Sequence, residues 1–174
     1  KISETGIIGE HPEWSLSTEA LYAKVSVSKE RNEYKTAVSY YSDENCTTAV
    51  ETPVITNTYT APTEGSAELE IQKAATESWT GKIPNYFQFK LEALTEGAPM
   101  PGTTAVTNNG SDVSFGKITG YKEVKDYIYK ISETGIIGEH PEWTVSSDVL
   151  YAKVSVRKEG NEYKTKVSYY SDEN

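Results

Sequence analysis

The sequence predicts an all-β protein made of immunoglobulin-like β-sandwich modules in tandem. Three observations predict this fold class. Residues 1–45 recur as residues 130–174 with 37 of 45 positions identical, and such a repeat at domain-sized spacing indicates tandem modules. Short runs alternate apolar and polar residues, which is the period of a strand with one buried face. No segment shows a helical period of useful length.

Seven runs are predicted as strands because they are rich in Val, Ile, Thr, Tyr and Phe and are bounded by Gly, Asn or Pro. In chain order they are Val54–Tyr59, Glu68–Ala74, Tyr86–Leu94, Val113–Ile118, Val124–Ser132, Val149–Lys158 and Glu162–Tyr170. Lys158–Asn161 is predicted as a hairpin turn, and Lys29–Asn32 is its copy. Thr95–Gly102 and Thr107–Asp112 are predicted as loops.

The differences between the two repeats preserve residue type or fall at turns and outward-facing positions. They are Ser15/Thr144, Leu16/Val145, Thr18/Ser147, Glu19/Asp148, Ala20/Val149, Ser28/Arg157, Arg31/Gly160 and Ala37/Lys166. The alternating apolar positions do not change: Leu21, Ala23, Val25 and Val27 match Leu150, Ala152, Val154 and Val156. We therefore expect both copies to bury the same face.

The repeat implies that the chain spans two modules. Residues 1–59 are predicted to be the C-terminal part of one repeat module, and 60–67 an inter-module linker stiffened by its proline. Residues 68–174 are predicted to be the N-terminal and middle part of the next module, whose last strand is missing. One module rebuilt from these pieces has about seven strands, as an immunoglobulin-like sandwich does.

Composition excludes several classes of function. The formal net charge of −9 disfavours nucleic acid and anionic membranes as partners, since both select for excess Lys and Arg. No apolar run reaches the roughly 18–20 residues that cross a bilayer. Cys46 is the only cysteine, so no intrachain disulfide can form. His11 and His140 have too few potential ligands nearby, and no nucleophile triad or phosphate loop occurs. We expect no metal, no cofactor and no turnover enzyme.

Three polar residues fall on strand faces that should be buried. Lys73 ends a Leu-x-Ile-x-Lys pattern, Asn57 lies within Ile-x-Asn-x-Tyr, and Glu133 ends Tyr-x-Tyr-x-Ile-x-Glu, with Glu4 as its copy. Residues two apart on a strand share a face. Burying a lone amine, amide or carboxyl would cost several kcal/mol, so we expect these groups to meet one another.

These patterns resemble a known family. A Lys in the first strand, a Glu closing Tyr-x-Tyr-x-Ile-x-Glu and an Asn in a terminal Thr-Asn-Thr-Tyr strand are similar to the streptococcal pilin isopeptide-linkage domain, a relative of the collagen-adhesin (Cna) B-type repeats of Gram-positive surface proteins. The Phe-x-Phe-x-Leu strand that follows the lysine also fits. The resemblance covers the rebuilt module and implies a Cna B-type sandwich. It also implies a spontaneous Lys–Asn isopeptide bond, with Lys73 as nucleophile, Asn57 as electrophile and Glu133 or Glu4 as catalyst.

This chemistry is physically reasonable, because burial disfavours the charged forms of amines and carboxyls alike. A neutral amine can attack the amide carbon while the protonated acid polarises the carbonyl and carries protons to departing ammonia. The alternative is a buried ion pair with a hydrogen-bonded Asn and no covalent bond. No single module here holds all three residues in the family order. Three routes stay open: a bond with a neighbouring module, with a strand swapped from another chain, or within a permuted module joining Lys73 to Asn57.

We therefore expect a structural repeat of a bacterial cell-surface fibre, pilus or adhesin stalk, extracellular and attached to the cell surface or wall. The expected partners are neighbouring repeat modules or other copies of the chain, through strand complementation. No nucleic acid and no membrane insertion are expected. The alternative is an immunoglobulin-like adhesin module that binds a host glycan or protein. Residues 95–112 contain no aromatic side chain, which favours the stalk.

Overall fold

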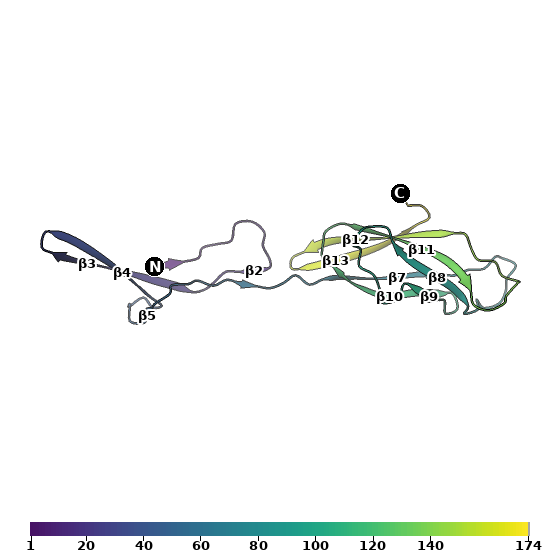
Figure 1. Cartoon of the computed structure of the whole chain (residues 1–174), viewed down its shortest axis with the longest axis horizontal. Coiled ribbons are helices and arrows are strands. Elements are labelled where there is room, and N and C mark those ends of the chain that lie inside the picture. Colours follow the sequence, from purple (N-terminus) through teal and green to yellow (C-terminus); the bar gives the residue numbers. More distant parts are fainter. Residues whose placement is uncertain (174) are drawn as a thin grey trace. The chain divides into compact units, whose positions relative to one another are not determined.

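The computed structural model describes residues 1–173; Asn174, the last residue of the predicted second segment, lies outside them. The prediction of an all-β protein is confirmed, since strands are the only regular elements of the described residues and all strand pairs are antiparallel (Figure 1). Residues 1–173 contain no helix that could span a membrane. The chain divides into two compact units, Lys1–Ala61 (unit 1) and Pro62–Asn174 (unit 2).

Unit 2 is a two-layer β-sandwich. Its strands are β7 (Gly65–Gln72), β8 (Phe87–Ala93), β9 (Ala105–Thr107), β10 (Asp112–Tyr121), β11 (Asp126–Ile136), β12 (Val149–Glu159) and β13 (Glu162–Tyr170). One layer has the order β13-β12-β11-β8-β9, and the other is the pair β10-β7 (Figure 1). Alternate residues of both layers are almost completely buried, among them Leu69, Ile118, Tyr129 and Val154. Burial of these apolar faces is the main stabilising contribution to unit 2.

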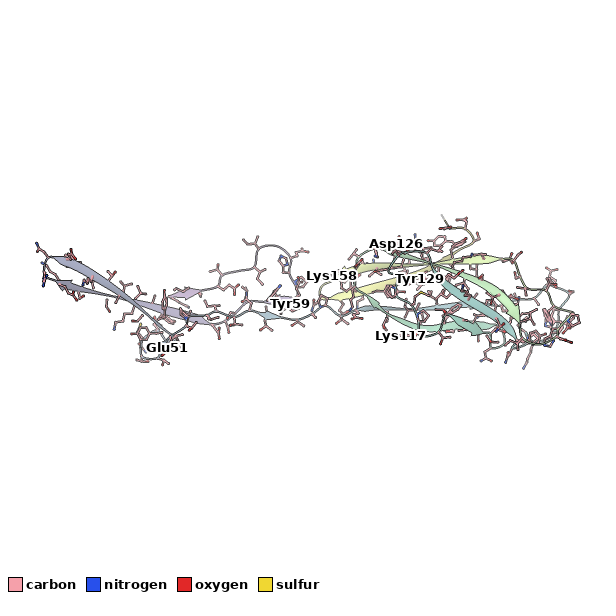
Figure 2. All side chains as sticks on the ribbon, viewed as in Figure 1. Glu51, Tyr59, Lys117, Asp126, Tyr129 and Lys158 are labelled. Carbon is pink, nitrogen blue, oxygen red and sulfur yellow. The ribbon has the colours of Figure 1, made fainter. Side chains whose placement is uncertain are left out.

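Two buried tyrosines hydrogen-bond across the core. The hydroxyls of Tyr121 in β10 and Tyr129 in β11 lie 2.8 Å apart, and that of Tyr129 also donates to the Pro99 carbonyl at 2.7 Å. Tyr129 lies among the strands of unit 2 (Figure 2). Burial raises the pKa of both phenols, and the hydrogen bond to Tyr121 raises that of Tyr129 further. Both hydroxyls therefore stay protonated while the core is packed.

Unit 1 has a four-stranded sheet and a separate strand pair. The sheet has the order β1-β3-β4-β5, and β2 pairs with β6. The strands are β1 (Ile2–Ser3), β2 (Trp14–Ser15), β3 (Ala20–Glu30), β4 (Glu33–Tyr41), β5 (Ala49–Val50) and β6 (Thr58–Tyr59). Among its described residues Leu21 is the only hydrophobic side chain that is buried.

The expectation that both repeats bury the same face is wrong for unit 1. Val25 and Val27 of β3 are 59% and 62% exposed, whereas their copies Val154 and Val156 in β12 are 0% and 5% exposed. The physical reason is the opposing layer. In unit 2 the β10-β7 pair covers β12 and its neighbours, and unit 1 has no equivalent of that pair.

Most predicted strands are present with shifted ends. β13 matches its prediction, whereas β7 begins at Gly65, inside the predicted linker, and ends just before Lys73. Val54–Tyr59 forms a strand only at its last two residues. Strand β9 was not predicted and takes Thr107 from a predicted loop, because Ala105–Thr107 pairs with β8. Strands β1, β2 and β5 are too short to show any period.

Candidate functional site

Lys73 and Glu133 meet in unit 2. Lys73 directly follows β7, and its backbone N–H donates to the Ser111 carbonyl at 2.7 Å, which extends the β7–β10 pairing. Glu133 lies in β11 opposite Phe89 of β8. The Nζ of Lys73 donates to Oε2 of Glu133 at 2.7 Å, and the two side chains are only 11% and 3% exposed. The same Nζ lies 4.5 Å from the centre of the Phe87 ring, so a carboxylate and an aromatic face enclose the amine.

The second oxygen of Glu133 has a different environment. Oε1 is buried and accepts no hydrogen bond from any described residue. Glu133 and Lys73 line a cavity of about 240 Å³, together with Ser146 and Asp148. A buried acceptor that lacks a donor costs about 1–3 kcal/mol. This half of the site therefore favours a hydrogen-bond donor entering the cavity.

Glu4 and Asn57 meet in unit 1. Glu4 follows β1, and Asn57 precedes β6, whose pairing with β2 holds Asn57 in place. The Nδ2 of Asn57 donates to Oε1 of Glu4 at 2.8 Å. Its Oδ1 accepts from the backbone N–H of Ser17 at 3.0 Å, and that N–H also lies 3.3 Å from Oε2 of Glu4. Both ends of the amide group are therefore hydrogen-bonded.

The Lys73–Glu133 pair and the Glu4–Asn57 pair, the two half-sites, are related by the repeat. Glu4 and Ser17 correspond to Glu133 and Ser146, 129 residues further along the chain. The glutamate holds an asparagine amide through Oε1 in unit 1 and a lysine amine through Oε2 in unit 2. Lys73 and Asn57 belong to different units. Each unit thus brings together two of the three predicted residue types. Unit 1 pairs the glutamate with an asparagine, and unit 2 pairs it with a lysine.

The aromatic residues around the half-sites pack on one another. In unit 2 Trp143 contacts Phe87 and Trp79 edge-on, with ring centres 5.1 and 4.8 Å apart, and His140 stacks on Tyr86 at 3.9 Å. In unit 1 Trp14 packs on Tyr59 at 5.0 Å. Within residues 1–173 no three His, Cys, Asp or Glu side chains are grouped as metal ligands would be.

Two groups of the site, a backbone N–H and an aromatic ring, were not predicted from the sequence. One is the backbone N–H of Ser17, because a main-chain donor has no residue-type signature. The other is the ring of Phe87 against Lys73, which the Phe-x-Phe-x-Leu pattern marked only as a buried strand position. Ser17 is identical in both repeats, but most positions of the repeat are, so this identity gave no specific signal for it.

The comparison with protein families decides the family. FctA, the Spy0128-like isopeptide containing domain, matches residues 69–174, more than half of the chain. The chain belongs to this family. The resemblance seen in the residue patterns is therefore confirmed, and with it the streptococcal pilin isopeptide domain fold. Domains of this family are generally non-enzymatic structural modules of bacterial surface proteins. Lys73 and Glu133 lie inside the match, and Asn57 lies outside it. The comparisons with curated proteins and with solved structures found no significant match.

Proposed function

We propose that the chain is a structural repeat of a bacterial cell-surface fibre, pilus or adhesin stalk, and that its modules are cross-linked by a self-catalysed Lys–Asn isopeptide bond. The observation that carries this proposal is the buried Lys73–Glu133 pair beside a cavity. The repeat copy of that glutamate, Glu4, holds the amide of Asn57. Family membership supports the same reading.

The residues are suited to a condensation between amine and amide. Lys73 Nζ transfers a proton to Glu133 Oε2, 2.7 Å away, and the neutral amine attacks Cγ of an Asn57-type residue. The Nζ–Cγ bond forms and the Cγ–Nδ2 bond breaks. The protonated carboxyl gives its proton to Nδ2, which leaves as ammonia. The carboxylate then takes the second proton that Nζ must lose to become an amide nitrogen and passes it to the departing ammonia or to water, which regenerates the carboxylate. The fold positions both reactants, so one turnover per module needs no substrate from solution.

The strand that brings the asparagine would resemble Val54–Tyr59. In unit 1 this segment pairs with β2 at Trp14 and Ser15, and their copies in unit 2 are Trp143 and Thr144. An Asn57-type side chain held there in the same way would donate to Oε1 of Glu133, the buried oxygen that lacks a donor. The strand comes from the adjoining module, from a second copy of the chain, or from the chain's own unit 1.

The same logic applies to unit 1. Its β3–β4 face carries the residues that β10 and β7 cover in unit 2. A β10-β7-type pair supplied by a neighbouring module or another copy would cover this face and bring a lysine to Glu4. On this proposal residues 1–59 are the C-terminal part of one module, and 68–174 are the N-terminal and middle part of the next. The bond would join the first strand of a module to its last, so that tension passes through a covalent link.

The test is the intact mass of an extended chain, in which residues 46–61 are appended after Asn174 to supply the missing strand. The expected mass is one ammonia below the sequence mass. Lys73→Met and Glu133→Gln should each restore the full mass. Glu4→Gln is the matched control, because it changes the copy of Glu133 in unit 1 and should leave the bond intact.

Fragment masses then locate the bond and identify the source of the strand. A Lys73 peptide joined to the appended segment indicates a bond within one module. In the unextended chain, a covalent dimer would indicate a swapped strand, and a monomer lighter by one ammonia would indicate the permuted module. An unshifted mass in every form would contradict the cross-link and leave a module held by an ion pair. The adhesin reading, with binding to a host glycan or protein, would then come first.

A further inference from the structure

The backbone N–H of Ser17 points at the oxygen on which charge would develop during bond formation. It donates to Asn57 Oδ1 at 3.0 Å, while Nδ2 at the other end of the amide donates to Glu4 Oε1 at 2.8 Å. The leaving nitrogen thus faces the proton-carrying carboxyl, and the carbonyl oxygen faces a main-chain donor. Attack on Cγ moves an electron pair onto Oδ1, and a donor already in place stabilises that oxyanion.

We propose that this N–H, and its copy at Ser146 in unit 2, forms the oxyanion hole of the isopeptide reaction. The inference rests on the proposed function and assigns a catalytic group to it that no side chain supplies. In unit 2 Ser146 lines the same cavity as Lys73 and Glu133. The repeat therefore predicts that the Ser146 N–H binds the carbonyl oxygen of the incoming asparagine, as Ser17 does for Asn57.

The serine side chain holds this N–H in position. The Oγ of Ser17 accepts from the backbone N–H of Glu19 at 3.2 Å, and the Oγ of Ser146 accepts from that of Asp148 at 3.1 Å. Such a local turn is made by Ser and Thr hydroxyls, and it restrains the orientation of the peptide groups around it. The two repeats differ at the other two positions of this turn and yet keep the same serine and the same hydrogen bond.

A second contact ties the turn to the asparagine strand. The carboxylate of Glu19 accepts from the backbone N–H of Thr56 at 3.4 Å, one residue before Asn57. The N–H of Ser17 also lies 3.3 Å from Oε2 of Glu4. In unit 2 the corresponding Oε2 of Glu133 is occupied by the Lys73 amine. With the lysine in place, the Ser146 N–H is therefore left to the amide oxygen.

The test removes only the N–H. The extended chain is assembled by ligation in denaturant, so that every molecule starts unreacted, with the Ser146 peptide group replaced by an ester. Folding is started by dilution, and loss of ammonia is followed by mass. Removing one oxyanion donor is expected to slow bond formation on the order of 100-fold or more. An ester at Gly97, an exposed residue of unit 2 that does not line the cavity, is the control for the ester linkage itself and should leave the rate unchanged.

The ester could also slow bond formation by weakening the docking of the appended strand. Measuring the docked fraction of that strand separates this effect from a loss of oxyanion stabilisation. In a Lys73→Met background, which cannot react, hydrogen exchange of the appended strand gives the docked fraction with and without the ester. The proposal requires the rate to fall far more than that fraction does. It is overturned if the rate is unchanged, or if rate and docking fall in proportion.

A side-chain series gives a second readout. Ser146→Ala keeps the N–H but removes the hydroxyl that orients it, and should slow the reaction several-fold; Ser146→Thr should restore the rate because it keeps the hydroxyl. Equal rates for all three would contradict the positioning role. If the unaltered extended chain loses no ammonia, the proposed function fails and this inference fails with it. If it loses ammonia and the ester is as fast, only this inference fails.

Discussion

Truncating the same valine in the two repeats should have very different consequences. Val25 pairs with Val38 in unit 1, and Val154 pairs with Val167 in unit 2, so strand propensity and strand partner are matched. Val154 is fully buried, whereas Val25 is 59% exposed. Val154→Ala removes two buried carbon atoms, worth about 1.6 kcal/mol of transfer free energy, and leaves a cavity that costs roughly 1 kcal/mol more.

Val25→Ala removes groups that are already largely in water and leaves no enclosed cavity, so it should cost below about 0.7 kcal/mol. The expected difference between the two variants is therefore about 2 kcal/mol. Hydrogen exchange followed by mass spectrometry, read across a urea series, measures the free energy of unfolding of each unit separately, because peptides from the two repeats differ in sequence. Equal losses in both units would refute the reasoning, and would mean that the valine face of unit 1 is covered in solution. Small losses in both would mean that the unit 2 core is not tightly packed.

Three further predictions follow from the structure. In chains that lack the cross-link, Lys73→Met should destabilise unit 2 by about 3–5 kcal/mol, because it leaves the Glu133 carboxylate buried without its cation. Urea unfolding measures this loss of unfolding free energy, and adding Glu133→Gln to Lys73→Met should recover much of it. Raising the pH above about 10 should destabilise unit 2, because the pKa values of the buried Tyr121 and Tyr129 phenols are raised and the folded state keeps protons that the unfolded state has released. This contribution to stability is fully present below that pH, and its loss above it is at most about 1.4 kcal/mol per pH unit per phenol. Measured melting temperatures between about pH 8 and about pH 11 should therefore depend less on pH in Tyr129→Phe than in the unaltered chain. Arg31→Gly should stabilise the β3–β4 hairpin by about 1 kcal/mol, since Arg31 has a φ of 56° and its copy Gly160 adopts 58° without strain. Hydrogen exchange of the hairpin amides should become slower, and unchanged or faster exchange would contradict the prediction.

The strand faces of the candidate site could be predicted from sequence because the direction of a side chain along a strand is a local property. Glu133 continues the buried stripe of Tyr127, Tyr129 and Ile131, and Lys73 follows the inward residues of β7. That these two side chains would meet was expected from the cost of burying either one alone. Which oxygen each partner contacts, and the main-chain donor at Ser17, were not predictable. They depend on the register and the loop geometry of strands far apart in the sequence.

The sequence by itself determined the repeat, the all-β class, the hairpin turns and the residue types of the site. These follow from local patterns that a strand or a turn imposes wherever it forms. Only the tertiary structure decided which copy of a pattern is buried. Residues 23–27 and 152–156 are identical, yet one set faces solvent and alternate residues of the other lie in a core, because only the β10-β7 pair of unit 2 supplies an opposing layer. A strand face is buried only when a second layer packs on it, and the sequence of the strand does not specify that layer.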